Sequence, residues 1–144
     1  VVFPNKWQKA ARGGRTTPSP RAEAYRQFFQ QLVDELREKH KFTGARIAQP
    51  MNWYAFASGF AGIVYGASFA QGKRVRVDLY IDQGYTEQNK KLFDWLSVRR
   101  AQIESEVGGP LEWERLDERR ASRVAVYRDG HIEDDETTLN DIRK

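Results

Sequence analysis

Residues 62–82, GIVYGASFAQGKRVRVDLYID, carry the pattern that decides the fold class. Apolar and polar side chains alternate along 74–82, as they do in a strand whose successive side chains point to opposite faces. An apolar run precedes this segment, and the intervening QGK at 71–73 has the length and the glycine of a tight turn. The stretch therefore predicts an antiparallel hairpin at the centre of the chain.

Pairing across this turn predicts which side chains share a face of the sheet. We expect the small residues of the first strand beside the apolar face of the second, where a helix could approach closely. The opposite face is then expected to combine arginines with aromatic and aliphatic side chains, namely Arg74, Arg76, Ile63, Tyr65, Phe69 and Tyr80. Such a face can stack bases and hold phosphates. The alternative, favoured by these residues alone, is a second core layer beneath a helix, with the arginines at its rim and paired to Asp78.

A long amphipathic helix is predicted before the hairpin. Apolar residues recur at helical spacing within 25–36 and predict a helix over 21–39. Ser19 is the expected N-cap and Pro20 the first helical residue, because proline fits that position without losing a hydrogen bond.

A second long helix is predicted over 87–107. Thr86 is its expected N-cap, and GGP at 108–110 ends it, with Gly108 in the left-handed conformation. Its buried stripe is expected to contain Leu92, Trp95, Leu96, Ile103 and Val107, with Phe93 beside it.

The remaining segments complete an α+β fold. Strands are predicted at NWYAFASG (52–59), LEWERL (111–116) and SRVAVYRD (122–129), and a C-terminal helix within 134–144 is capped by Asp135 or Thr137. The order of elements and the short connections predict an antiparallel β-sheet of about five strands, with two long helices packed on it and a C-terminal helix.

The charge of the chain is unevenly distributed. The net charge is +4, and residues 1–20 contain Lys6, Lys9, Arg12 and Arg15 but no acidic residue. Residues 21–144 contain as many basic as acidic side chains and are formally neutral. The surplus therefore lies in one basic tail, which could contact a phosphate backbone.

The sequence offers little for catalysis. It has no cysteine and only two histidines, His40 and His131, at no metal-ligand spacing, and it has no nucleophile elbow or phosphate loop. A two-carboxylate site built from Asp78, Asp82 or the acids at 112–118 is less expected than ordinary surface acids. We expect no cofactor, no metal, no membrane span and a cytoplasmic location.

Several spaced segments resemble one family. NWYAFASGFAG, VRVDLYID, NKKLFDWL and IESEVGGPLEWERLDERRASRVAVY follow one another in the order seen in domain of unknown function 4268 of bacteria and archaea, over about residues 21–144. Members of that family often follow a domain that resembles PD-(D/E)XK nucleases. The resemblance implies that 1–7 is a remnant of an upstream nuclease-like domain, 8–20 a basic flexible linker and 21–144 a single α+β domain. It assigns no catalytic residue.

Two functions remain open. The first is an accessory domain that assists nucleic-acid binding, DNA or another nucleic acid, for a nuclease-like neighbour in the same chain, in a setting of defence against foreign DNA. The tail residues and Arg74, Arg76, Tyr65 and Tyr80 are its expected contacts. The second is a protein-interaction or homodimerisation module without nucleic-acid affinity, which the neutral charge of 21–144 favours.

Overall fold

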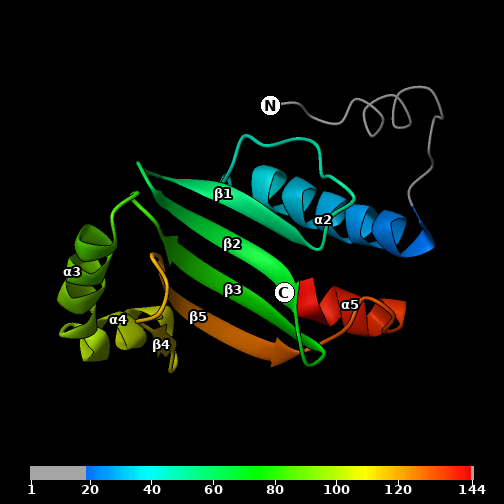
Figure 1. Cartoon of the computed structure of the whole chain (residues 1–144). Coiled ribbons are helices and arrows are strands. Elements are labelled where there is room, and N and C mark those ends of the chain that lie inside the picture. The colour runs from blue at the N-terminus through cyan, green and yellow to red at the C-terminus, as the bar shows by residue number, and fades with distance from the viewer. Residues whose placement is uncertain (1–18, 144) are drawn as a thin grey trace.

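The computed structural model describes residues 19–143, which form a five-stranded antiparallel sheet and four helices (Figure 1). The strands lie in the order β1-β2-β3-β5-β4. Their bounds are β1 (Trp53–Phe60), β2 (Ile63–Ala70), β3 (Arg74–Ile81), β4 (Glu112–Glu114) and β5 (Ser122–Asp129). The helices are α2 (Pro20–Glu38), α3 (Thr86–Ser97), α4 (Arg100–Val107) and α5 (Glu136–Arg143). The α+β class and the antiparallel sheet of five strands are thus confirmed.

The predicted segment 1–7 and most of the predicted linker 8–20 lie outside the described residues. The same holds for the basic tail, Lys6, Lys9, Arg12 and Arg15.

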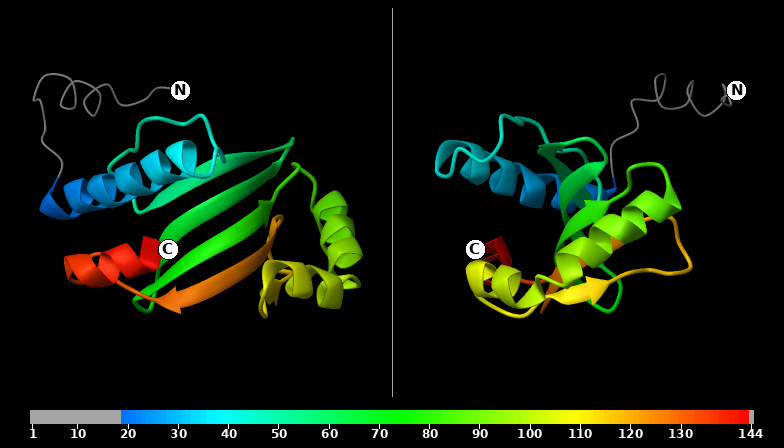
Figure 2. Two further views of the ribbon diagram at one scale, coloured as in Figure 1. Left: turned by 180° about the vertical axis from the view of Figure 1, so that it is seen from behind. Right: turned by 90° about the vertical axis from the view of Figure 1, so that its left-hand side faces the viewer.

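Helices cover one side of the sheet. Figure 2 shows α2, α4 and α5 on the same side, with α3 beside the ends of the strands. Helices α2 and α5 lie over one end of the sheet, and α3 and α4 lie at the other end (Figure 1). We call the side that carries the helices the helix face and the opposite side the open face.

The hairpin is confirmed, but the predicted register is wrong by one residue. Ala70 pairs directly with Arg74, and the ladder continues to Ile63 opposite Ile81. Directly opposed residues of an antiparallel pair point to the same face. The three-residue turn between the strands therefore puts even-numbered residues of β2 and β3 on one face and odd-numbered residues on the other.

The first long helix is confirmed within one residue. Ser19 Oγ accepts a hydrogen bond from Ala22 N at 3.1 Å, and Pro20 is the first residue of α2. Phe28 and Phe29 of this helix are buried against Phe69 of β2, with the rings of Phe28 and Phe69 edge to face and 4.8 Å apart. This aromatic cluster holds α2 on the helix face.

The second long helix is not continuous, contrary to the prediction. It divides into α3 and α4, and Arg99, with φ −103° and ψ 15°, stands between them. Its guanidinium lies 3.7 Å from the ring centroid of Trp95 and donates to the Trp95 carbonyl at 2.7 Å. Arg99 thus satisfies a carbonyl that the interrupted helix leaves without its usual partner.

The caps and the buried stripe of this region differ in part from the prediction. Helix α3 is preceded by Tyr85 as its N-cap, and Thr86 is its first residue. Trp95 and Val107 are exposed rather than buried, whereas Phe93 is buried. The buried side of α3 carries Asn89, Lys90 and Phe93, and Trp95 follows Phe93 by two residues and therefore points away from that side. Gly108 has φ 98° and ends α4, as predicted.

Two buried polar residues of α3 tie it to the segment between β4 and β5. Lys90 Nζ donates to three carbonyl oxygens, those of Arg115, Leu116 and Ala121, and to Ser122 Oγ, at distances of 2.5 to 3.0 Å. Asn89 is fully buried and donates to the Arg120 carbonyl at 2.9 Å. These bonds satisfy a run of backbone groups that no strand or helix pairs.

We predict that Lys90→Met destabilises the domain by about 3 kcal/mol, because it leaves buried carbonyls without donors. The matched control is Lys91→Met, since Lys91 is exposed and forms only an i,i+4 pair with Glu87 at 3.6 Å. Its effect is expected to stay below about 1 kcal/mol. Urea unfolding of both variants measures the difference, and equal losses would show that the Lys90 bonds do not hold the fold.

Candidate functional site

Aromatic rings and arginines of β1, β3 and β5 lie together on the open face. The register places Trp53 of β1 opposite Ser68, Arg76 opposite Tyr127, and Tyr80 opposite Arg123. All of them therefore point to the side that the helices of residues 19–143 leave uncovered (Figure 2). The face carries these rings and cations: Trp53, Tyr80, Tyr127, Arg74, Arg76 and Arg123.

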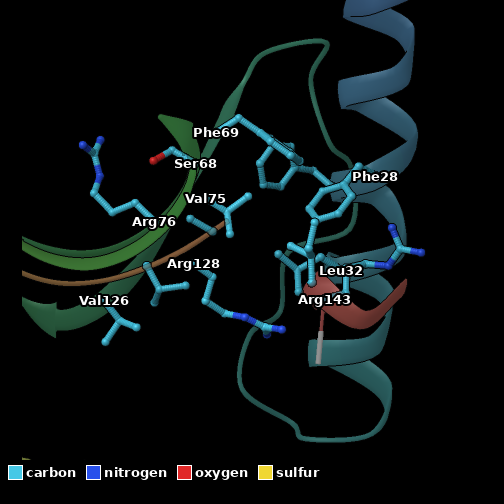
Figure 3. A pocket seen from close by; sticks show the side chains of 13 residues that line it. Phe28, Leu32, Ser68, Phe69, Val75, Arg76, Val126, Arg128 and Arg143 are labelled. Atoms are coloured by element: carbon cyan, nitrogen blue, oxygen red, sulfur yellow. The ribbon is translucent and has the colours of Figure 1, made fainter. Parts of the chain in front are cut away.

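Three of the predicted site residues lie together and one does not. Arg74, Arg76 and Tyr80 share the open face, whereas Tyr65 lies opposite Leu79 on the helix face. Figure 3 shows the division directly: Phe69 and Val75 point toward α2, while Ser68 and Arg76 point away from it. The expectation that Ile63, Tyr65 and Phe69 join the arginines is therefore wrong.

The aromatic partners of the arginines come from other strands than expected. Trp53, Tyr127 and Arg123 were not predicted as site residues, because pairing between strands distant in sequence brings them to this face. The length of the QGK turn was the available signal for the correct register of β2 and β3. No comparable signal in the sequence places β5 beside β3.

Most charges on the open face are paired. Arg123 Nε donates to Glu114 Oε1 at 2.7 Å, and the Tyr127 hydroxyl donates to Glu114 Oε2 at 2.7 Å. Arg76 Nε lies 3.3 Å from Asp78 Oδ2, without the geometry of a hydrogen bond, and is a buried nitrogen with no hydrogen-bond partner in residues 19–143. Arg76 and Arg123 are thus bound to acids on the same face.

Arg74 is the more available cation. Its guanidinium lies 4.1 Å from the ring centroid of Tyr127, and the residue is exposed. Within residues 19–143 it forms no ion pair. Arg74 can therefore contact an anion without breaking an internal salt bridge.

Asp78 is a buried carboxylate at the centre of this face. Its side chain is 8% exposed and lies against Gly66, where any Cβ atom would collide with the Asp78 carboxylate. Burial raises the pKa of Asp78 and nearby Glu114 adds to the rise, while Arg76 and Arg123 oppose it. The missing side chain at Gly66 makes room for an acid on the open face, rather than for a helix as predicted.

Glu114 has the opposite electrostatic balance. Burial acts to raise its pKa, but the hydrogen bonds from Tyr127 and Arg123, together with the positive charges of Arg123 and Arg76, hold the pKa below its ordinary value. Two acids in one cluster therefore have pKa values displaced in opposite directions, an arrangement frequent at functional sites.

A hollow of about 270 Å³ opens beside this cluster. Trp53 and Tyr80 line it together with Ser68, Arg76 and Asp78. Trp53 is 48% exposed and Tyr80 37% exposed, so both rings have a free surface. The hollow can hold a planar group against an exposed aromatic ring, within reach of an acid and a guanidinium.

The helix face carries a different kind of surface. A cavity of about 330 Å³ is lined mainly by apolar side chains of the sheet and of α3 and α4, including Tyr65, Val77, Leu96, Ile103 and Val126. A second cavity of about 250 Å³ lies beside α2 and α5, and Val77 and Val126 line both (Figure 3). An apolar depression thus runs between the two pairs of helices.

The described residues contain no metal-binding group. Among residues 19–143, no cluster of three or more His, Asp or Glu side chains could hold an ion. Within the same range, no helix is both long and apolar enough to cross a membrane. The site therefore consists of aromatic, arginine and carboxylate groups on a sheet surface.

These features define a small α+β domain whose antiparallel sheet is covered by helices on one side and presents a polar, aromatic surface on the other. The family model "Domain of unknown function (DUF4268)" matches residues 24–141. The chain belongs to this family, which confirms the resemblance seen in the sequence. No curated protein and no solved structure matches the chain significantly.

We predict that the pKa of Asp78, measured by carbon-13 NMR of its carboxyl group, lies above the ordinary aspartate value of about 3.9. Because the folded state then binds this proton more tightly than the unfolded state, the stability that Asp78 contributes at low pH is lost as the pH rises through its folded pKa. The carboxyl signal that disappears in the Asp78→Asn variant is the signal of Asp78.

Arg76→Gln is expected to raise the pKa of Asp78 further, because Arg76 favours the ionised carboxylate. Arg128→Gln is the matched control, since Arg128 points to the helix face and is expected to leave the titration unchanged. A titration of Asp78 at or below the ordinary value would contradict burial as the dominant influence.

Proposed function

We propose that this domain contacts single-stranded nucleic acid through its open face, as an accessory domain. The single observation that carries the proposal is the gathering of Trp53, Tyr80 and Tyr127 with three arginines on the uncovered side of the sheet. Bases stack on exposed aromatic rings of a sheet, and arginine contacts phosphates or stacks in turn.

The charges of the open face favour a single strand over a duplex. The three arginines on this face are outnumbered by four acids, Asp78, Glu112, Glu114 and Asp129. A face without net positive charge gives little attraction to the dense phosphates of a duplex. Stacking needs no net positive charge, and an unpaired base offers a free ring and a free hydrogen-bonding edge.

The basic tail supports the same proposal from outside the described residues. Lys6, Lys9, Arg12 and Arg15 supply the positive charge that the open face lacks. In this proposal the tail contacts phosphates and the face contacts bases, so that affinity depends on salt mainly through the tail. A nuclease-like neighbour in the same chain, acting in defence against foreign DNA, is the setting in which such a domain would position a substrate.

A protein-interaction module is the second candidate. The observation that favours it is the apolar depression between the helix pairs, where Val77 is 60% exposed and Tyr65 41% exposed. Exposed apolar patches of this kind occur at protein interfaces. This function would use the helix face and leave the open face free.

Fluorescence anisotropy with labelled single-stranded DNA, single-stranded RNA and duplex DNA tests the proposal. We predict that Trp53→Ala with Tyr80→Ala weakens single-strand binding about tenfold or more, because each stacked base contributes about 1–3 kcal/mol. Trp95→Ala is the matched control, since Trp95 is 54% exposed but lies on α3.

Replacing the four tail cations with glutamine is expected to flatten the salt dependence and leave the effect of the face variants in place. Unchanged binding by the face variants, or a preference for duplex DNA, would contradict the proposal. Absence of binding to all three probes would favour the interaction module.

A further inference from the structure

The outer edge of β1 is the longest unpaired strand edge of the described residues. The carbonyl of Asn52 accepts a hydrogen bond from Phe69 N at 2.8 Å and therefore faces β2. Backbone groups of successive strand residues point alternately to the two sides, so those of Trp53, Ala55 and Ala57 face away from β2. No hydrogen bond within residues 19–143 satisfies them.

From Trp53 to Ala57, before the bulge that lies between Ala57 and Phe60, this edge lacks the usual protection against pairing. Strand β1, WYAFASGF, is eight residues long and contains neither a charged residue nor a proline. The opposite edge is different: β4 has three residues, two of them glutamates, and the part of β5 beyond it carries Arg128 and Asp129. Proteins normally shorten or charge the edges that must not pair, and only one edge of this sheet is treated in that way.

The side chains of β1 suit a second copy of the same strand. In a symmetric antiparallel pair centred on Ala55, Trp53 of each copy lies beside the small Ala57 of the other, on the open face. Tyr54 and Phe56 lie beside each other on the helix face, where cross-strand aromatic pairs are favourable. Large side chains thus meet small ones on one face, and rings meet rings on the other.

Apolar side chains next to β1 enlarge the same surface. The loop before β1 exposes the apolar side chains of Phe42, Ile47 and Met51. Phe42 packs on Phe56, and the Ile47 carbonyl accepts a hydrogen bond from the Tyr54 hydroxyl at 3.3 Å. This loop therefore lies against the helix-face side of β1 and offers the apolar area that a strand pair alone does not supply.

From these observations we propose that the domain forms a homodimer by antiparallel pairing of β1 with β1 of a second copy. The two five-stranded sheets then become one sheet of ten strands. The twofold axis that relates antiparallel neighbours is perpendicular to the sheet, so both open faces lie on the same side. The proposal goes beyond the proposed function and does not depend on it, although the dimer would double the surface that a single strand can follow.

Sedimentation equilibrium of residues 1–144 together with hydrogen exchange tests the dimer. We expect the mass to rise from monomer to dimer with concentration. The amides of Trp53, Ala55 and Ala57 are expected to exchange fast when dilute and slowly when concentrated, because only pairing at this edge protects them.

Ala55→Lys is expected to weaken the dimer about tenfold or more, because it places two ammonium groups beside each other at the twofold axis. Ala101→Lys, which adds the same charge at an exposed position of α4, is the control and is expected to leave the dimer intact. Thermal unfolding at low concentration confirms that each variant monomer is folded.

A chain that stays monomeric at all concentrations would overturn the proposal. So would a dimer in which the three β1 amides remain unprotected, since that result would place the interface elsewhere, as in the depression on the helix face. Nucleic-acid binding by a monomer would leave the proposed function standing while the dimer fails.

Discussion

The length of one turn determines how the surface of this domain is divided. Gln71, Gly72 and Lys73 connect β2 to β3, and both Gly72 and Lys73 adopt positive φ, 78° and 56°. Three residues make Ala70 and Arg74 direct partners, and every side chain of the two strands takes its face from that pair. A turn one residue longer or shorter would reverse the two faces of β3 relative to β2. The arginines and Asp78 of β3 would then lie under α2 and α5, where apolar side chains now pack.

The polar interior of the structure follows from the same division. With Val75, Leu79 and Phe69 directed to the helices, Asp78 and Arg76 must lie on the side without a helix. There Asp78 is buried by its own neighbours rather than by a second layer, and Gly66 leaves the space for it. A buried acid in an uncovered face costs stability unless charges compensate it, which the arginines of β3 and β5 do.

Longer-range polar contacts hold the rest of the chain on this sheet. Helix α3 is joined to the segment between β4 and β5 through Asn89 and Lys90, whose side chains donate hydrogen bonds to carbonyls 25 to 31 residues away in sequence. The short strand β4 and its two glutamates depend on that anchoring, and Glu114 in turn orders Arg123 and Tyr127. The aromatic and arginine surface is therefore supported from the far end of the domain.

The sequence by itself determined the local elements. Helix α2 with its Ser19 cap, the central hairpin, β5, the glycine end of α4 and a cap at Asp135 follow from periodicity and capping, which act between residues close in the chain. It did not determine the break at Arg99, because the apolar spacing continues through it and the compensating bond to Trp95 forms only in the folded chain.

Only the tertiary structure decided the composition of the site. Arg74, Arg76 and Tyr80 were predicted from one strand, and strand pairing adds Trp53, Arg123 and Tyr127 to the same face. The register of β2 and β3 places Tyr65 on the helix face instead. Alternation fixes which residues of one strand go together, yet it does not say which face meets the helices or which strand lies alongside. Those choices depend on turn geometry and on packing between segments far apart in sequence, and the energy of burying Phe28 and Phe29 against Phe69 settles them.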